Sequence, residues 1–173
     1  IGKDSGNWFH MFIIDKGTDD GIQVDMNVIA GGGLVGIVTK VGPDWAQVRS
    51  IIDDMSNVSA MILKNSDLCY VRGDLEMMSE GTLQLTEGTL QLNQLRDEDD
   101  EVVQGDKVVT SYASAKYHEG ILIGYVNELS TDANNLTKSG SLTPAVDFEH
   151  LSTVLVITDL KQQVNTDDLN SAE

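Results

Sequence analysis

Cysteine, proline, aromatic residues and cations are all scarce in this chain of 173 residues. Its one cysteine, Cys69, excludes an internal disulfide and a zinc site built on several thiolates. Aromatic residues make up 5% of the chain, and apolar runs such as residues 154–157 are short. A membrane-spanning helix needs ~20 apolar residues. The sequence therefore excludes both a disulfide scaffold and a spanning helix.

Negative charge dominates the composition. Lys and Arg total 11 against 28 Asp and Glu, which gives a formal net charge of -17, and no basic run occurs. Nucleic acid and anionic membrane surfaces are both bound by clustered cations, so both are disfavoured as partners. With 40% hydrophobic residues, the chain can bury the core of one domain or of two small β domains. It begins at Ile1 rather than Met, so we expect an excised piece of a longer protein, upstream of which any membrane anchor or signal would lie.

Glycine is frequent, with 16 residues against two prolines. The glycines recur between short runs rich in Val, Ile and Leu, which is typical of strands joined by tight turns. No window sustains the apolar spacing of an amphipathic helix over three turns. The sequence therefore predicts an all-β fold. The predicted strands are residues 8–14, 26–30, 34–41, 46–52, 58–63, 68–72, 82–86, 89–93, 106–111, 121–127, 136–143 and 152–157.

One internal repeat has a period of seven: residues 81–87 (Gly-Thr-Leu-Gln-Leu-Thr-Glu) precede residues 88–94 (Gly-Thr-Leu-Gln-Leu-Asn-Gln). A two-residue turn at residues 87–88 would place the four leucines of the two copies on one face, with Leu85 opposite Leu90. The repeat therefore predicts a hairpin. A chance duplication within a loop is the alternative.

Residues 31–36 (Gly-Gly-Gly-Leu-Val-Gly) match the G-x-G-x-x-G pattern of dinucleotide-binding proteins. In those proteins a helix follows the glycines, and its N-terminus faces the pyrophosphate. Here the β-branched run of residues 37–41 follows instead. The pattern therefore predicts a hairpin loop at residues 31–33 and a bulge or close backbone contact at Gly36, with no nucleotide cofactor.

Two acidic segments invite a metal site. Residues 15–21 (Asp-Lys-Gly-Thr-Asp-Asp-Gly) look calcium-like, but Asp20 stands where an EF-hand requires glycine. The run at residues 97–101 (Asp-Glu-Asp-Asp-Glu) could bind a cation loosely, although such runs are usually solvated loops. The three histidines lie far apart and at no ligand spacing. We therefore predict no metal site and no cofactor.

Nucleophilic catalysis has little support in the sequence, because no G-x-S-x-G elbow occurs. Ser111, Ser114 and His118, with various aspartates, supply the atoms that a Ser-His-Asp system would need. Serines beside a turn are more often hydrogen-bonding loop residues. We therefore predict no catalytic residues, and a double-barrel serine hydrolase acting outside the cytoplasmic membrane stays as the alternative.

Short motifs follow one another in a set order from residue 7 to residue 157. They are Asn-Trp-Phe (7–9), Asp-Lys-Gly-Thr-Asp-Asp-Gly (15–21), Gly-Leu-Val-Gly (33–36), Val-Gly-Pro (41–43), Ile-Asp-Asp (52–54), Val-Arg-Gly-Asp (71–74), Gln-Gly-Asp-Lys-Val-Val (104–109), Gly-Ile-Leu-Ile-Gly (120–124) and Val-Asp-Phe (146–148). No single motif is specific. Together, their order and spacing resemble the extracytoplasmic domain of the bacterial rod shape-determining MreC family. Residues 112–119 depart from the family pattern, which has paired glycines and Phe-Pro there.

The resemblance implies two packed six-stranded β-barrels, an architecture like that of double-barrel serine proteases but without a triad. We expect the first barrel at residues 1–74 and the second at residues 75–160, with strand exchange between them allowed. Residues 161–173 have little apolar content, so they predict a disordered tail.

The resemblance also implies a function and a set of partners. It implies a non-catalytic scaffold on the outer face of the bacterial cytoplasmic membrane, held by an N-terminal anchor, that organises cell-wall elongation and rod shape. Its implied partners are the membrane protein MreD, the actin-like MreB across the membrane and a class B penicillin-binding protein, with a homo-oligomer also allowed. A periplasmic adaptor or adhesion module would share the barrels and is a third class of function.

Amphipathic aromatic residues in a loop make good interface anchors. On this ground we predict a partner contact at Tyr112, Tyr117, His118 and Ile121. The alternative is that Tyr117 and Ile121 plug the end of a barrel, since single exposed apolar residues are ordinary.

Overall fold

The fold consists of β-strands and one short 3-10 turn, η1, in the part of the chain that the structure describes. The computed structural model describes residues 2–3, 10–74, 90–95, 97 and 101–161. The elements are β1 (Gly2–Lys3), β2 (Met11–Ile14), η1 (Thr18–Asp20), β3 (Asn27–Ala30), β4 (Gly33–Val41), β5 (Ala46–Ser50), β6 (Asn57–Ile62), β7 (Leu68–Gly73), β8 (Leu90–Leu95), β9 (Lys107–Thr110), β10 (Leu122–Thr131), β11 (Lys138–Pro144) and β12 (Leu155–Ile157). The predicted all-β class is confirmed. Among the described residues, no helix has the length and apolar character to cross a bilayer.

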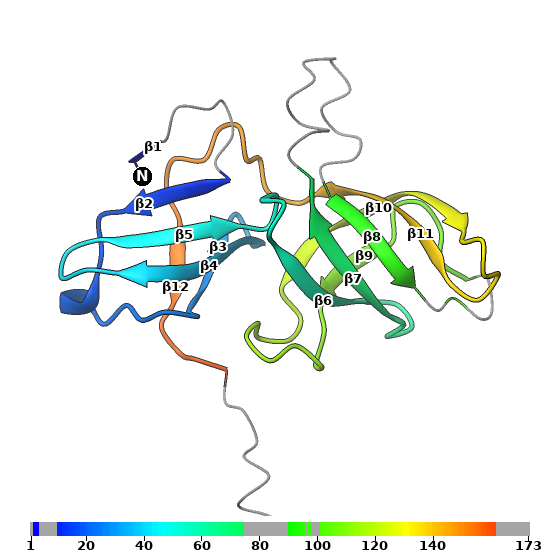
Figure 1. Ribbon diagram of the computed structural model, residues 1–173, viewed down its shortest axis with the longest axis horizontal. Coiled ribbons are helices and arrows are strands. Elements are labelled where there is room, and N and C mark those ends of the chain that lie inside the picture. Colours follow the sequence, from blue (N-terminus) through cyan, green and yellow to red (C-terminus); the bar gives the residue numbers. More distant parts are fainter. Residues whose placement is uncertain (1, 4–9, 75–89, 96, 98–100, 162–173) are drawn as a thin grey trace, which may run out of the picture.

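Strands from both ends of the sequence form the first set, which runs in the order β1-β2-β5-β4-β3-β12. All of its pairings are antiparallel. β12 lies near the end of the described chain but pairs with β3, so the orange strand lies among the blue and cyan ones in Figure 1. The chain therefore returns near its described end to pair with the N-terminal strands through residues 155–157.

The second set comprises β6 to β11, coloured from teal through green to yellow in Figure 1. Its pairings run β6-β7-β8-β11-β10-β9, and β9 pairs with both β6 and β10. One parallel pairing, Leu122 with Gly33, joins β10 to β4 of the first set. The two strand sets therefore belong to one hydrogen-bonded sheet.

Glycines shape the β3–β4 hairpin as the sequence predicts. Gly31 and Gly32 have φ values of 57° and 80°, and the residues on either side pair as Ala30 with Gly33. This is the left-handed backbone that a two-residue turn requires at both positions. Gly36 lies where β4 approaches β5 so closely that a Cβ would overlap the carbonyl oxygen of Arg49. The predicted hairpin loop and close contact are both confirmed.

The core is one cluster of buried apolar side chains shared by both strand sets. The largest of its fully buried members are Met26, Leu34, Ile51, Ile52, Ile62, Leu92, Leu95, Ile123 and Leu142. They come from strands and connections of both sets, so the sets share one apolar interior.

The predicted hairpin of the internal repeat is wrong for its second copy. β8 has β7 on one edge and β11 on the other: Leu90 lies opposite both Gly73 and Leu142. A strand has only two edges, so Leu90 cannot also pair with Leu85. The predicted strand at residues 82–86 and the turn at 87–88 lie outside the described residues.

Candidate partner-binding loop

Residues 111–121, between β9 and β10, form a compact loop held at its base by Thr110. The Thr110 hydroxyl donates to the carbonyl of His118 at 2.5 Å and accepts from the amide of Ile121 at 2.8 Å. The amide of Gly120 donates to the Thr110 carbonyl at 2.9 Å. Inside the loop, the Ser114 hydroxyl accepts from the amide of Tyr117 at 3.0 Å. These bonds fix the backbone of the 111–121 loop without a helix or strand.

Asn27 of β3 binds the 111–121 loop from the other strand set. Its side chain is almost fully buried; Nδ2 donates to the carbonyl of Lys116 at 3.0 Å, and the amide of His118 donates to Oδ1 at 2.8 Å. The Lys116 ammonium also lies 3.2 Å from a carboxylate oxygen of Asp25. Asn27 therefore acts as a bridge between the two strand sets. No sequence pattern predicts this role, because a single asparagine in a strand belongs to no motif.

The segment after β12 also binds this loop. His118 Nε2 lies 2.7 Å from the carbonyl oxygen of Asp159. The Lys161 ammonium donates to the carbonyl of Tyr112 at 3.0 Å and to that of Ser114. Lys161 is thus held by the loop, although it was predicted to begin a disordered tail. Residues 162–173 lie outside the described residues.

The four predicted contact residues differ in exposure. Tyr112 is 57% exposed and His118 is partly exposed, whereas Tyr117 is 7% exposed and lies in the core, with Ile121 packed against it. Burial raises the pKa of the Tyr117 phenol to about 12, although a hydrogen bond with Ser56 acts to lower it. The structure therefore leaves Tyr112 as the aromatic side chain that this loop presents to solvent.

The groups that a serine hydrolase would need point to different partners. The Ser111 side chain is buried, and its hydroxyl oxygen lies 2.8 Å from that of Ser59. The His118 ring contacts Asp159, and the Ser114 hydroxyl accepts from loop amides. A nucleophile needs a base within hydrogen-bond reach. Ser114 instead stabilises the loop backbone, and Ser111 packs against Ser59.

The other reactive or ligating groups also have structural surroundings. Burial raises the pKa of the Cys69 thiol in β7 to about 12, so it stays protonated and unreactive at neutral pH. Within the described ranges, no cluster of three or more His, Cys, Asp or Glu side chains could hold a metal ion. The calcium-like segment at residues 15–21 forms a turn around η1. There the Asp20 carboxylate accepts from the amide of Gly17 at 3.2 Å, a bond that lowers the pKa of Asp20.

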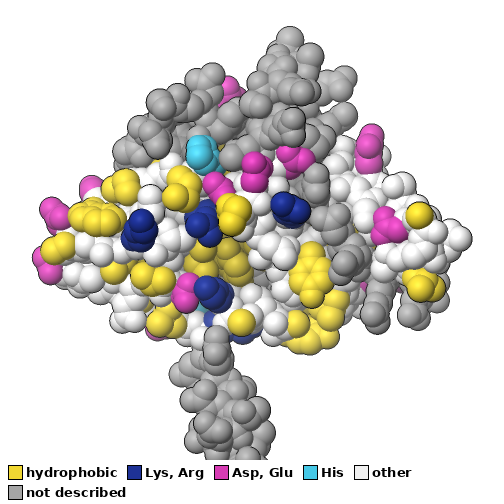
Figure 2. All heavy atoms as spheres, viewed as in Figure 1, with side chains coloured by type: hydrophobic (Ala, Val, Ile, Leu, Met, Phe, Trp, Pro, Cys, Tyr) yellow, Lys and Arg dark blue, Asp and Glu magenta, His cyan; other side chains and the backbone are white. Residues whose placement is uncertain are grey.

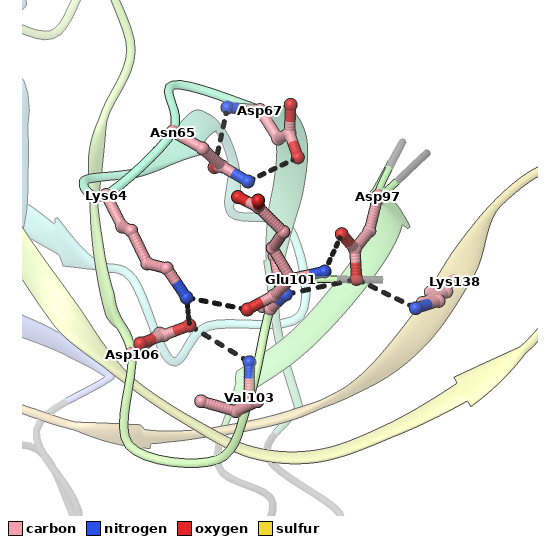
Figure 3. Close-up of polar contacts among 9 residues, drawn as sticks. Lys64, Asn65, Asp67, Asp97, Glu101, Val103, Asp106 and Lys138 are labelled. Atoms are coloured by element: carbon pink, nitrogen blue, oxygen red, sulfur yellow. Dashed lines mark hydrogen bonds and ion pairs between the residues drawn. The ribbon is translucent and has the colours of Figure 1, made fainter. Parts of the chain in front are cut away.

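The acidic run at residues 97–101 is not simply a solvated loop, because Asp97 is buried. Its carboxylate accepts from the amides of Glu101 at 2.8 Å and Val102 at 3.2 Å, and from the ammonium of Lys138 at 2.7 Å (Figure 3). For Asp97 the expectation of a solvated side chain is wrong, because a cation distant in sequence neutralises it. Residues 98–100 lie outside the described residues.

We expect Asn27→Ala to release the 111–121 loop. The substitution removes the buried partner of the His118 amide and of the Lys116 carbonyl, which should cost about 1 kcal/mol of stability. Hydrogen exchange should accelerate at the amide of His118. Asn134→Ala is the matched control, because Asn134 caps an exposed turn through Leu136 and Thr137. Unchanged exchange at His118 in Asn27→Ala would contradict the bridging role.

Comparison with known proteins decides the family. A family model described as "Rod shape-determining protein MreC, barrel core" matches residues 1–158. The chain belongs to the MreC family. The "Cell shape-determining protein MreC" of Listeria monocytogenes is 30% identical over 169 residues, which cover 97% of this chain and 55% of that protein. The chain thus spans about half the length of this MreC relative.

Solved MreC structures have the same fold. The Listeria MreC structure aligns with a TM-score of 0.78 at 30% identity, covering 95% of this chain and 76% of that one. A structure of the major periplasmic domain of the cell shape-determining filament MreC aligns at 0.65 and 24% identity, covering 85% and 84%. MreC from a Helicobacter pylori complex with Penicillin-Binding Protein (PBP2) aligns at 0.55 and 18% identity, covering 75% and 74%. The last two show likeness of fold alone.

Proposed function

We propose that this chain is the extracytoplasmic part of a scaffold that organises cell-wall elongation and rod cell shape through protein contacts. Membership of the MreC family is the observation that carries the proposal. The proposed location is the outer face of the bacterial cytoplasmic membrane, with an anchor in a segment other than these residues. In this proposal MreD, MreB and a class B penicillin-binding protein are the partners. The fold likeness to an MreC solved with PBP2 supports the penicillin-binding protein in particular.

The proposed role is non-catalytic. Ser111, Ser114 and His118 are engaged in binding the loop backbone and its neighbours, which supports a structural use of these residues. Rigid β-structure that presents loops is a suitable support for protein contacts. The hydrolase alternative has no nucleophile and base in contact among these candidates.

The proposed architecture is two packed β-barrels. Each of the strands β6 to β11 has two neighbours within the second set, which supports a barrel there. The first set runs from β1 to β12 and would make the other barrel, which among the described residues is left open between its end strands. We propose residues 1–74 for the first barrel and residues 75–160 for the second, with strands exchanged between them. The pairings support such an exchange, because β6 and β7 pair within the second set and β12 pairs with β3 of the first set.

The proposed penicillin-binding protein contact centres on the 111–121 loop. Tyr112 would be the aromatic anchor, His118 a polar neighbour, and Tyr117 and Ile121 the packed base that holds the loop. A second exposed apolar surface, around β6 and β7, provides a control for the 111–121 loop. Leu63, Leu68 and Tyr70 are exposed around β6 and β7, where Figure 2 shows a hydrophobic patch. The patch borders a groove of about 1090 Å³ whose lining includes Tyr70 and Arg72.

We expect Tyr112→Ala to weaken binding of the extracytoplasmic part of a class B penicillin-binding protein from the same bacterium. A buried aromatic anchor at an interface is worth about 2 kcal/mol or more, so the Kd should rise about 30-fold in calorimetry. Tyr70→Ala is the matched control, because Tyr70 is 45% exposed but lies on β7. If Tyr70→Ala alone weakens binding, the loop contact is wrong while the scaffold proposal stands. If no penicillin-binding protein binds the unmodified chain, the scaffold proposal itself fails for this partner.

A further inference from the structure

A cleft opens in the first strand set between β12 and the end of β2. It has a volume of about 450 Å³, and its lining consists of Ile14, Asp15, Lys16, Asp20, Ile22 and residues 152–156. Ile14 and Ile22 are almost fully buried, so the cleft has an apolar floor. Its size falls in the range of roughly 300–1,000 Å³ that ligand sites occupy.

One wall of the cleft is a strand with an unused edge. Among the described residues, β12 pairs with β3 on one side and with no strand on the other. A free strand edge presents backbone N–H and C=O groups in a row, and such a row is complementary to another extended chain. Proteins usually blunt free edges with charge or proline, but residues 153–157 read Thr-Val-Leu-Val-Ile. Leu155 is 66% exposed there.

The charge of the cleft selects the kind of chain that fits it. Its lining holds two carboxylates, Asp15 and Asp20, and one ammonium, Lys16, which lies 3.3 Å from a carboxylate oxygen of Asp20, so the lining carries a net negative charge. The whole chain carries a net charge of -17. A second copy would therefore be repelled at low salt, whereas a segment with lysine or arginine would be attracted.

We propose that this cleft binds an extended basic segment of a partner protein, which adds a strand to the free edge of β12. Alternate apolar side chains of the segment enter the cleft over Ile14 and Ile22. Its Lys or Arg side chains face Asp15. The site is distinct from the 111–121 loop, so this proposal stands or falls independently of the penicillin-binding protein contact.

The test uses two synthetic peptides as probes, Ac-Lys-Val-Thr-Val-Lys-Val-NH₂ and its counterpart with Glu in place of Lys. We expect the basic peptide to bind the 173-residue chain, to slow hydrogen exchange in residues 155–157, and to bind less tightly as salt is raised. The acidic peptide should bind at least tenfold more weakly. Equal binding of the two peptides, or no binding of either, would overturn the proposal.

Variants locate the site. Leu155→Lys and Asp15→Lys should each raise the Kd of the basic peptide at least tenfold, because the first blunts the edge and both repel the probe. The controls are Leu136→Lys and Glu128→Lys, which make the same changes at exposed positions of the β10–β11 hairpin. Unfolding midpoints check that all four variants fold. If the control substitutions weaken binding as much as the other two, the basic peptide is attracted by the net negative charge of the whole chain and not by the cleft. If Leu155→Lys instead abolishes a dimer of the unmodified chain in sedimentation, the occupant is a second copy. Either result would refute the proposal.

Discussion

Replacing Gly36 by valine should unfold the chain or leave it barely stable. A Cβ at this position would overlap the Arg49 carbonyl oxygen and lie 2.7 Å from the Cα of Ser50. Both obstacles are backbone atoms of β5, which pairs with β4 through Gly36 and Ser50, so neither can rotate away. Overpacking a core costs roughly 1–3 kcal/mol when side chains can adjust. We expect at least about 3 kcal/mol here, against a total stability of about 5–15 kcal/mol.

The matched control is Gly31→Asn in the same hairpin. Gly31 has positive φ, but nothing lies within 4 Å of a Cβ built there. Asparagine tolerates the left-handed region, so the substitution should cost no more than about 1 kcal/mol. Chemical denaturation of the three chains measures the difference. Similar midpoints for Gly36→Val and the unmodified chain would contradict the close packing of β4 on β5.

Local patterns predict the strands well, because most of the strands are short runs rich in Val, Ile or Leu and are bounded by turn residues. β4 and β5 coincide closely with the predicted residues 34–41 and 46–52, and the differences lie at their ends. The patterns say nothing about partners distant in the sequence. β12 joins β3, and β7 and β11 occupy both edges of β8, so the predicted hairpin of the repeat fails. Non-local pairing is set by the whole fold.

The candidate site was predictable only in part, for the same reason. A loop rich in tyrosine is visible in the sequence, and Tyr112 is exposed as a contact residue requires. The sequence left two uses of Tyr117 open, a partner contact or a plug at a barrel end, and the burial of its side chain agrees with the second, because Tyr117 packs in the core and forms a hydrogen bond with Ser56. Asn27 and Lys161 bind the loop from positions 89 and 47 residues away from Lys116 and Ser114. Such contacts leave no mark on local sequence.

Asp97 also depends on a partner distant in the sequence, Lys138. Replacing Asp97 should lower the stability of the fold by an amount comparable to that expected for Gly36→Val. The Asp97 side chain is fully buried, and that of its partner Lys138 is 17% exposed. Asp97→Ala leaves the Lys138 ammonium and the amides of Glu101 and Val102 without this acceptor. Breaking a buried ion pair in this way typically costs 3–5 kcal/mol, so we expect a loss of about 3 kcal/mol in denaturation experiments. Lys116→Ala, which removes an exposed pair with Asp25, should cost less than about 1 kcal/mol.

The Asp97 carboxylate should also make the stability of the fold depend on pH. Burial acts to raise the pKa of Asp97, but the hydrogen bond from Lys138 and those from the two amides outweigh it, so the pKa lies below its ordinary value. A lowered pKa stabilises the fold above the unfolded value of about 3.9, and this contribution is lost as pH falls through the folded value. Asp97→Asn removes the titrating group while nearly keeping its shape. The stability gap between the unmodified chain and Asp97→Asn should therefore be constant near neutral pH and should shrink below about pH 4. A gap of the same size at about pH 7 and about pH 2 would show that the charge of Asp97 contributes nothing to the fold.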